Sequence, residues 1–329
     1  MPKQPSKQPA YGGQAVIEGV MFGGKNVNVT AIRRVDNRID FFEEIRAEEA
    51  CWLTLLKKVP LLRGIVALVL SASLGAKHLN FAVERFERQP EEDKNIVPTE
   101  RSSKLASLLG VAVLAVLTFL FGKVVFTAFP AFLASFFDRW LLLDSAAATN
   151  FLRNVVEGGI KALLLLVYIG VIARTPMVKR LFQYHGAEHK VINTFEAGQP
   201  LTVESVRRHS RLHYRCGSSF MIFTVIVGVL VYSFFYYDSV WDRVLDRLIL
   251  LPLVIGLSYE VLRISNAMRE IPGLKFMGYP GLWLQRLTTQ EPDDRQIEVS
   301  IASFQRMRQL EEELASQRRS AKVSQAGSF

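Results

Sequence analysis

Long apolar runs separated by charged segments dominate this 329-residue chain. A helix that crosses a bilayer needs roughly 20 mostly apolar residues, because the hydrocarbon core is about 30 Å thick and a helix rises about 1.5 Å per residue. The pattern therefore predicts a mainly α, polytopic membrane protein with about four transmembrane helices. The four stretches are Leu105–Phe137, counted as one tilted or kinked span, Val155–Ala173, Phe220–Tyr237 and Leu248–Ile264.

A further apolar segment, Leu61–Ala76, is shorter than these four. It has 16 residues, contains Arg63 and follows Lys57 and Lys58. These features favour a helix that lies in the interface or is re-entrant over a fifth span. A fifth span would move the N-terminus to the other side of the membrane.

Basic residues indicate the orientation of the spans. The positive-inside rule places the segment between the second and third spans in the cytoplasm, and with four spans both termini lie there too. The net charge of +9 then reflects topology and a preference for anionic lipid headgroups, and we expect no nucleic acid partner. Cys51 and Cys216 are both expected in the cytosol, so no disulfide is predicted. The basic residues are Arg174, Lys179, Arg180, Lys190, Arg207, Arg208, Arg211 and Arg215.

The parts outside the spans have distinct compositions. Residues 11–50 are rich in glycine and β-favouring residues, so they predict a small cytosolic β-rich region. Within it, Val27–Val35 and Arg38–Phe42 form a hairpin across Asp36-Asn37, because Asp and Asn tolerate tight turn geometry. Before and after this region we expect a disordered tail at 1–10, and an interfacial or re-entrant helix with a charged linker at 51–104.

The transmembrane region at 105–266 is followed by a connector and an amphipathic helix at 267–315, and by a disordered tail at 316–329. Helical spacing gives this last helix one apolar face, which is typical of docking or self-association. The face consists of Ile297, Ile301, Phe304, Met307, Leu310 and Leu314.

Four of the five histidines fall within 29 residues and are regularly spaced. His185 and His189 are four apart, as are His209 and His213, so on helices each pair could present two imidazoles to one metal ion. Glu196 and Cys216 fall on the corresponding helical faces. The spacing predicts a cytosolic helical hairpin at 174–218, whose facing sides carry two histidines and a glutamate, and two histidines and a cysteine.

The first helix of this hairpin contains the pattern H-x-x-E-H. In inverted zinc peptidases the two histidines of this pattern hold zinc, and the glutamate, here Glu188, is the general base. The residues leave the third ligand open among His213, Glu196 and Cys216. They also leave open that the histidines are ordinary interfacial residues, that Cys216 and His213 form a nucleophile and base, or that the site is a closed structural zinc clamp.

Two other acidic residues lie in apolar surroundings. Glu18 is either a turn residue or a contact to substrate or metal. Glu260 near the end of the last span could pair with Arg263, and ionisable groups at membrane depth are functional candidates. His78 stands alone and is expected to be structural.

Four segments resemble those of the YqhQ-like family of bacterial membrane proteins, a domain of unknown function often labelled a predicted metal-dependent enzyme. They are YGGQAVIEGVM (Tyr11–Met21), YHGAEHKVI (Tyr184–Ile192), HYRCGSSF (His213–Phe220) and PGLWLQRLTTQEPDD (Pro280–Asp294). The resemblance implies a bacterial cytoplasmic (inner) membrane location. It also implies a polar core of His185, Glu188, His189, His213 and Cys216, strengthens Glu18 and Glu196, and leaves His209 outside the family pattern.

The sequence thus favours a metal-dependent, zinc-type hydrolase at the cytosolic face of the membrane, acting on an unknown substrate. His185 and His189 would be ligands and Glu188 the general base. The alternative is a non-catalytic membrane scaffold or assembly protein with a structural metal or histidine cluster. A transporter is disfavoured, because the spans contain few polar groups beyond Lys123, Lys161 and Glu260.

Overall fold

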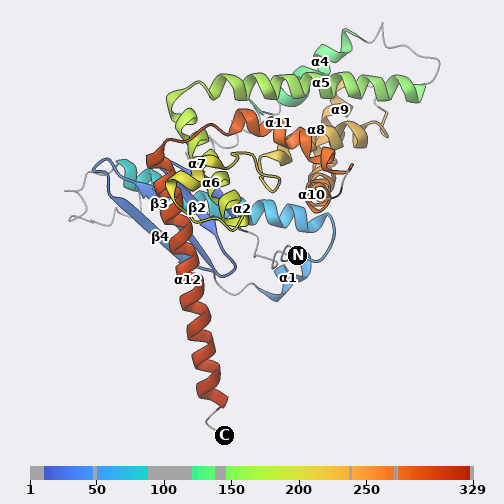
Figure 1. Cartoon of the computed structure of the whole chain (residues 1–329). Coiled ribbons are helices and arrows are strands. Elements are labelled where there is room, and N and C mark those ends of the chain that lie inside the picture. Colours follow the sequence, from blue (N-terminus) through green and yellow to red (C-terminus); the bar gives the residue numbers. More distant parts are fainter. Residues whose placement is uncertain are drawn as a thin grey trace, which may run out of the picture.

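A small sheet with its covering helices lies beside a group of apolar helices in the computed structural model of this chain (Figure 1). The structure describes residues 11–46, 50–87, 121–122, 124–137, 146–236, 239–269, 271 and 273–326. The expected tail at 1–10, most of the charged linker and the first part of the span Leu105–Phe137 lie outside these residues. In the described part the chain is mainly helical.

Four antiparallel strands follow one another in the order β1-β2-β3-β4. They are β1 (Gly12–Val16), β2 (Gly19–Gly23), β3 (Val27–Arg33) and β4 (Ile39–Ile45). The predicted β-rich region and its hairpin are confirmed, since β3 pairs with β4 from Val27↔Ile45 to Arg33↔Ile39. Asn37 takes the left-handed φ of 66° that the tight turn requires.

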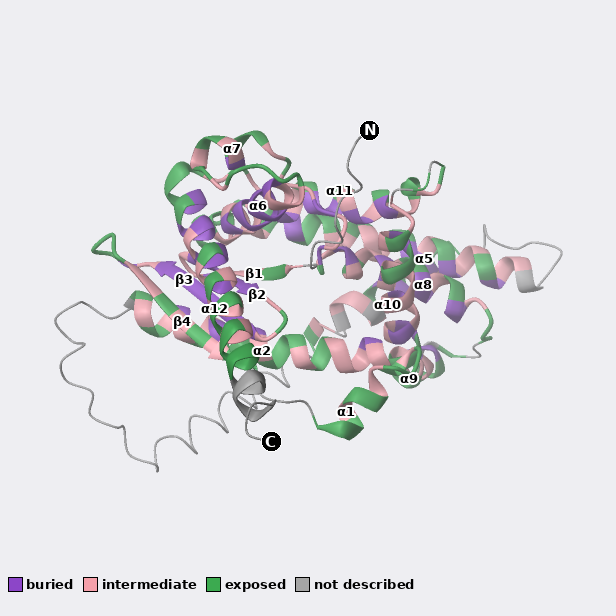
Figure 2. Cartoon of the chain, turned by 60° about the horizontal axis from the view of Figure 1, so that its bottom comes forward, coloured by how far each residue is buried: buried purple, intermediate pink, exposed green. Residues whose placement is uncertain are grey.

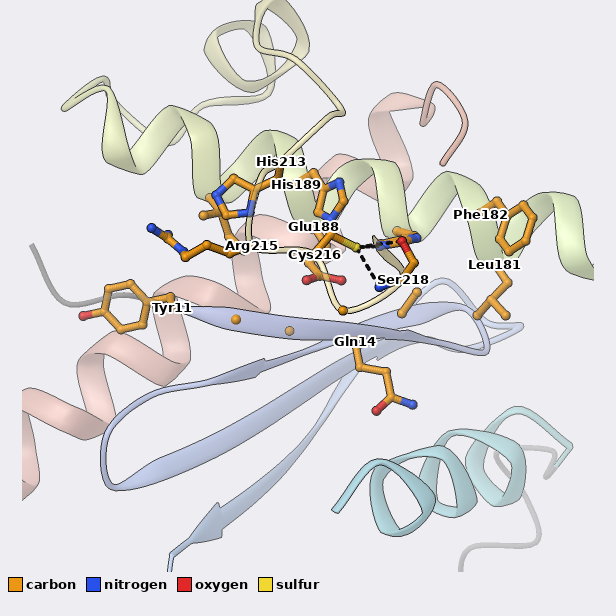
Figure 3. Close-up of a pocket in the computed structure, with 16 residues that line it drawn as sticks. Tyr11, Gln14, Leu181, Phe182, Glu188, His189, His213, Arg215, Cys216 and Ser218 are labelled. Atoms are coloured by element: carbon orange, nitrogen blue, oxygen red, sulfur yellow. Dashed lines mark hydrogen bonds between the residues drawn. The ribbon is translucent and has the colours of Figure 1, made fainter. Parts of the chain in front are cut away.

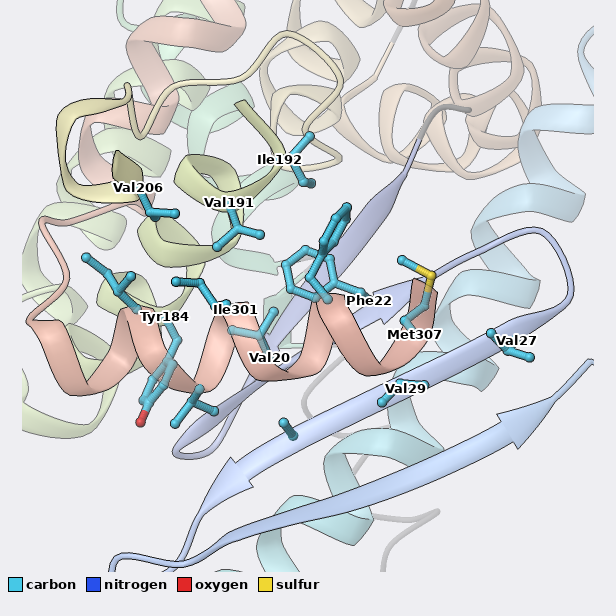
Figure 4. Close-up of a cluster of buried hydrophobic side chains, with 14 residues drawn as sticks. Val20, Phe22, Val27, Val29, Tyr184, Val191, Ile192, Val206, Ile301 and Met307 are labelled. Carbon is cyan, nitrogen blue, oxygen red and sulfur yellow. The ribbon is translucent and has the colours of Figure 1, made fainter. Parts of the chain in front are cut away.

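Helices cover one face of the sheet with an apolar core (Figure 4). The covering elements are α6 (Pro176–Glu196), α7 (Val203–Arg208) and α12 (Asp294–Ala326). The Phe304 ring lies edge-on to Phe22 and Tyr11, with centroids 5.1 and 5.2 Å apart. The apolar face of α12 thus docks on this chain's own sheet, where burial of each large side chain contributes about 1.5–3 kcal/mol.

The second half of α2 (Leu62–Glu87) covers the opposite face of the sheet. His78 is fully buried there, and its Nδ1 lies 2.6 Å from the Thr30 hydroxyl. The Lys77 ammonium lies 2.5 Å from a Glu44 carboxylate oxygen of β4. Since Val29 and Thr30 point to opposite faces, β3 is buried on both sides.

The first half of α2 leaves the sheet and contacts the apolar helices. The short α1 (Cys51–Leu56) precedes it, and a turn at Leu61 with a φ of 69° joins the two. Arg63 forms an ion pair with Glu260. The partner of this carboxylate is therefore Arg63 and not Arg263, the residue that the sequence suggested. The segment 50–76 thus starts at the end of β4 and returns to the sheet.

Two described helices are long and apolar enough to cross a membrane, Leu62–Phe86 and Ala148–Ile172, and a bent pair would make a third. The second lies within α5 (Ala146–Ile172), and the pair is α9 (Val240–Ile249) with α10 (Leu251–Ala267), bent by 54°. The fold is therefore consistent with a membrane protein. The other apolar elements are shorter: η2 (Val124–Ala128), α4 (Phe129–Ser135) and α8 (Ser219–Tyr232).

A buried ion pair ties α5 to α9. Glu157 is 1% exposed and accepts two hydrogen bonds from the Arg247 guanidinium, and Lys161 Nζ lies 3.0 Å from the same carboxylate. Arg247 lies on α9, and its charge is matched by Glu157.

The predicted helical hairpin is only half present. Gly198, with a φ of 68°, ends α6, and Thr202 caps α7, but α7 ends at Arg208. Residues 209–218 form a loop, so His209 and His213 do not share a helical face. Side chains of α6 hold this loop, with Asn193 Nδ2 2.7 Å from the Ser210 carbonyl, and such bonds compete with helical ones.

The connector after α10 contains η3 (Lys275–Gly278) and α11 (Tyr279–Thr288). Asp293 and Gln296 then cap α12 reciprocally, at 2.8 and 3.0 Å, as in a capping box. This helix runs to Ala326, ten residues beyond the start of the expected disordered tail at Ser316. The tail is rich in Gln, Arg, Lys and Ala, which favour helix once an upstream segment is anchored.

Candidate metal centre

The candidate site lies between β1, α6 and the loop 209–218, where α6 crosses the first strand (Figure 3). Its cavity measures about 310 Å³. The helix begins at Pro176, whose missing N–H costs nothing in the first turn. Nine to thirteen residues later it presents His185, Glu188 and His189 towards the strand and the loop.

His185 is held by a segment that crosses α6. Its Nδ1 lies 2.8 Å from the Thr288 carbonyl oxygen, so Nδ1 carries the proton and donates it. The crossing is possible because residue 186 is glycine: a Cβ there would lie 2.1 Å from the Gln290 carbonyl oxygen. The Gly of HGAEH therefore fixes the distance between α6 and the Thr288 carbonyl.

His189 has the same arrangement on the other side. Its Nδ1 lies 2.7 Å from the Arg211 carbonyl oxygen in the loop. A histidine that donates from Nδ1 keeps the lone pair on Nε2, and this is the tautomer of most metal-binding histidines with a fixed outer partner. Burial, only partly offset by Cys216, lowers the pKa of His189, so the ring is neutral at pH 7.

Cys216 completes a group of three donors. Its Sγ lies 3.2 Å from His185 Nε2, and the ligand atoms of His185, His189 and Cys216 all lie within 4.8 Å of one another. Burial opposes ionisation of the thiol, but the interaction with the adjacent His189 ring and the hydrogen bonds with Ser218 outweigh it and lower the pKa of Cys216. The Ser218 hydroxyl is 3.0 Å and its N–H 3.4 Å from the sulfur.

Glu188 lies on the strand side of this group. Its carboxylate approaches Gly13 of β1, where a Cβ would be 3.0 Å from Glu188 Oε1. Burial, reinforced by Cys216, raises the pKa of Glu188 to about 8. Oε2 is buried and has no hydrogen-bond partner among the described residues. A cation beside Glu188 would oppose that shift and favour the carboxylate.

His213 lies at the edge of the group. Its backbone is fixed by the Gln285 amide through two hydrogen bonds of 2.8 Å, and its ring centroid is 5.7 Å from that of His189. Burial, followed by the positive charge of Arg269, lowers the pKa of His213 to about 4. Its Nε2 is buried without a hydrogen-bond partner in the described chain, at 3.7 Å from Glu196.

Three other candidates have partners outside this group. Glu196 forms an ion pair with Arg215. Glu18 accepts from Arg180 at 2.5 Å and takes a φ of 52° in the turn between β1 and β2. His209 has its Nδ1 2.9 Å from the Ser205 carbonyl at the end of α7.

Several residues of the site were not identified from the sequence. Gly13, Gly186, Ser218, Thr288 and the Arg211 carbonyl all position the donors. The glycines lie inside the motifs YGGQ and HGAEH. A glycine at such a position indicates that another part of the chain approaches the backbone closely. Backbone acceptors such as Arg211 leave no trace in residue identity.

Apolar helices long enough to cross a membrane join a small antiparallel sheet here, with a histidine, cysteine and carboxylate group where the two parts meet. The chain belongs to a family described as protein of unknown function (DUF1385), whose model matches residues 59–310. It is similar to the uncharacterized protein YqhQ of Bacillus subtilis (strain 168), with 53% identity over 304 residues, 92% of this chain and 93% of that protein. The family inferred from the four motifs is therefore confirmed. No solved structure matches the chain.

Gly186 offers a test of how the site is held together. We expect Gly186→Ala to destabilise the protein by about 1–3 kcal/mol, because the new methyl group forces the Gln290 carbonyl away from α6. Thermal unfolding of detergent-purified protein measures this effect. Gly217→Ala is the control, since a Cβ there meets nothing within 4 Å. Equal behaviour of the two variants would contradict the role of the crossing.

Proposed function

We propose that this protein is a metal-dependent, zinc-type hydrolase that acts at the cytosolic face of the membrane. The observation that supports this most is the convergence of two imidazole Nε2 atoms on the Cys216 sulfur, with both Nδ1 atoms bound to backbone carbonyls. A single thiol proton satisfies only one of two such lone pairs. A divalent cation would satisfy both lone pairs and the thiolate together.

The donor set fits a catalytic ion better than a closed structural one. Catalytic zinc sites have three protein ligands, drawn from histidine, cysteine and carboxylate, and leave the fourth position open, and His185, His189 and Cys216 supply three such ligands. When bound, such an ion would supply Lewis acidity and bring the pKa of a water molecule at the site towards neutrality. Among the open candidates for the third ligand, the proposal selects Cys216.

Glu188 would act as the general base. It follows His185 by three residues and precedes His189 by one, so it projects beside the donor face of α6, next to β1. The contact with Gly13 positions the carboxylate at the cavity. Its Oε2 has no hydrogen-bond partner among the described residues, so this oxygen could accept a proton. A substrate carbonyl or phosphoryl group would enter through the cavity of about 310 Å³.

One observation favours the alternative of a structural cluster in a scaffold protein. His213 has a buried, unpartnered Nε2 and its ring lies next to that of His189. A rearranged His213 would give a fourth ligand and close the site. Metal analysis together with the Glu188→Gln variant separates the two functions, as argued below.

We also propose that both termini are cytosolic in a bacterial inner membrane crossed several times. Segment 50–76 follows β4 in the chain, and α2 leads from Glu260 of α10 at Arg63 back to Glu44 of the sheet at Lys77, which supports a re-entrant element over a complete span. The sheet, α6 and α12 would then share the cytosolic side. The opposite loops would include the start of α9.

Cysteine labelling in intact cells tests this orientation. In a Cys51→Ser background, Ser239→Cys at the start of α9 should react with an impermeant maleimide from outside. Ser316→Cys on α12 should react only after the cells are permeabilised, although both serines are exposed. Labelling of both positions from outside would refute the proposed topology.

A further inference from the structure

A second cavity lies on the other side of the sheet from the metal centre. It measures about 870 Å³ and is bounded by the edge of the sheet, by α1 and α2, and by α10. It does not share a lining residue with the metal centre. Its lining residues are Asn28, Glu44, Arg46, Lys57, Lys58, Arg63, Ala67, Leu70, Ser71, Leu74, Tyr259 and Arg263.

Positive charge dominates the polar side of this cavity. Five basic residues line it, of which Arg63 pairs with Glu260 outside the lining, and the one acid of the lining, Glu44, already pairs with Lys77 at 2.5 Å. The Arg46 guanidinium is held in place by a neutral partner, since Nε and one terminal nitrogen lie 3.0 and 2.7 Å from Asn28 Oδ1. Its orientation is therefore fixed, and no carboxylate in the described part of the chain forms an ion pair with it.

The opposite side of the cavity is apolar. Ala67, Leu70 and Leu74 follow one another at helical spacing along α2 and line it together. Beside it, α1 exposes Trp52 and Leu55 at 64% and 63%. Apolar side chains of this kind at a helix end are typical of the membrane interface, where Trp is enriched. The cavity thus lies beside the part of α2 that runs between α10 and the sheet. Figure 2 shows how α2 is arranged relative to these elements.

We propose that this cavity binds the phosphate-bearing headgroup of an anionic membrane lipid, with one acyl chain along α2. Arg46, Lys58 and Arg263 would contact the phosphate, because guanidinium and ammonium groups form charge-assisted hydrogen bonds with it. Ala67, Leu70 and Leu74 would contact the first methylene groups of the chain. The lipid would thereby connect the sheet to the bilayer. This assignment does not depend on the hydrolase proposal.

Binding of short-chain lipids to the full-length protein in detergent tests the assignment. The probes are dioctanoyl phosphatidylglycerol, dioctanoyl phosphatidylcholine and inorganic phosphate, and native mass spectrometry measures their occupancy. We expect phosphatidylglycerol to bind at least about fivefold more tightly than phosphatidylcholine. Arg46→Gln and Arg263→Gln should each weaken it by about fivefold, the contribution of one basic residue at a membrane surface.

Two controls separate this site from general electrostatic attraction. Arg174→Gln removes the same charge from an exposed position at the end of α5, and should leave binding unchanged. Ala67→Phe fills the apolar side without changing charge, so it should weaken phosphatidylglycerol while binding of inorganic phosphate persists. Thermal unfolding shows whether each variant folds. If Arg46→Gln does not fold, Ala67→Phe and Arg263→Gln still test the site.

The opposite results would overturn the proposal. Equal affinity for the two lipids would show that charge is not recognised. Equal effects of Arg174→Gln and Arg263→Gln would show that the cavity is not the site. Inorganic phosphate that binds as tightly as phosphatidylglycerol would show a free-anion site and not a lipid site.

Discussion

Alanine at His185, His189 or Cys216 should remove the bound metal from this protein. We expect about one divalent ion per chain in the wild type, and a fall of at least tenfold in each variant, since even the loss of an outer partner of a ligand costs about 10–100-fold in affinity. All three donors belong to one group within 4.8 Å, so no pair of them should retain the ion alone. Elemental analysis of detergent-purified protein after dialysis measures the ratio.

His209→Ala is the matched control for this experiment. His209 lies in the same loop as His213, but its Nδ1 binds the Ser205 carbonyl at the end of α7. Its removal should leave the metal content unchanged. Wild-type protein without stoichiometric metal would refute the metal centre, and loss in His209→Ala equal to that in His189→Ala would show a general effect on folding.

His213→Ala separates the two forms of the site. In the open, catalytic form the metal content is retained, because His213 is not one of the three converging donors. In a closed structural form it falls with the others. The same preparations therefore test the third ligand that the sequence left open among His213, Glu196 and Cys216.

The sequence predicted the parts of this site that lie on one helix. His185, Glu188 and His189 are spaced for α6, and the structure has a helix there, from Pro176 to Glu196. Cys216 was one of several candidates, because its position depends on the path of the loop 209–218. That path is set by side chains of α6 such as Asn193, whose partners are backbone carbonyls and not particular residue types.

The sheet was predictable for a similar reason, since its hairpins are local. The turn at Asn37 and the alternation along β3 can both be read from neighbouring residues. The two different environments of α2 could not be predicted from the sequence. One half of this helix packs under the sheet and the other against α10, and a single apolar stretch does not reveal two different environments.

Glu157 illustrates the same limit in the apolar helices. Its partner Arg247 is 90 residues away on a separate helix, so sequence spacing gave no indication of the pair. The Glu157 carboxylate of α5 and the Arg247 guanidinium of α9 neutralise one another at 1–4% side-chain exposure. Charge counts along a sequence therefore say more about the side of the membrane than about which residues meet.

Glu188→Gln should keep the metal and slow hydrolysis by about 10²–10⁴-fold. The substitution preserves the shape of the side chain and leaves His185, His189 and Cys216 intact, so metal content should equal that of the wild type. A general base contributes about 10²–10⁴-fold to the rate, and turnover should fall by this factor. A panel of ester, amide and phosphodiester substrates, followed with metal-loaded protein in detergent, measures the rates.

The outcome decides between the two proposed functions. Glu204→Gln is the control, because Glu204 is an exposed acid of α7 whose partner is Arg208 on the same helix. It should retain full turnover. If metal-loaded wild type hydrolyses none of the panel and Glu188→Gln alters neither metal content nor stability, the cluster is a structural link between α6 and the loop 209–218. If Glu188→Gln retains both metal and turnover, another group accepts the proton, and the buried carboxylate beside Gly13 serves only to shape the cavity.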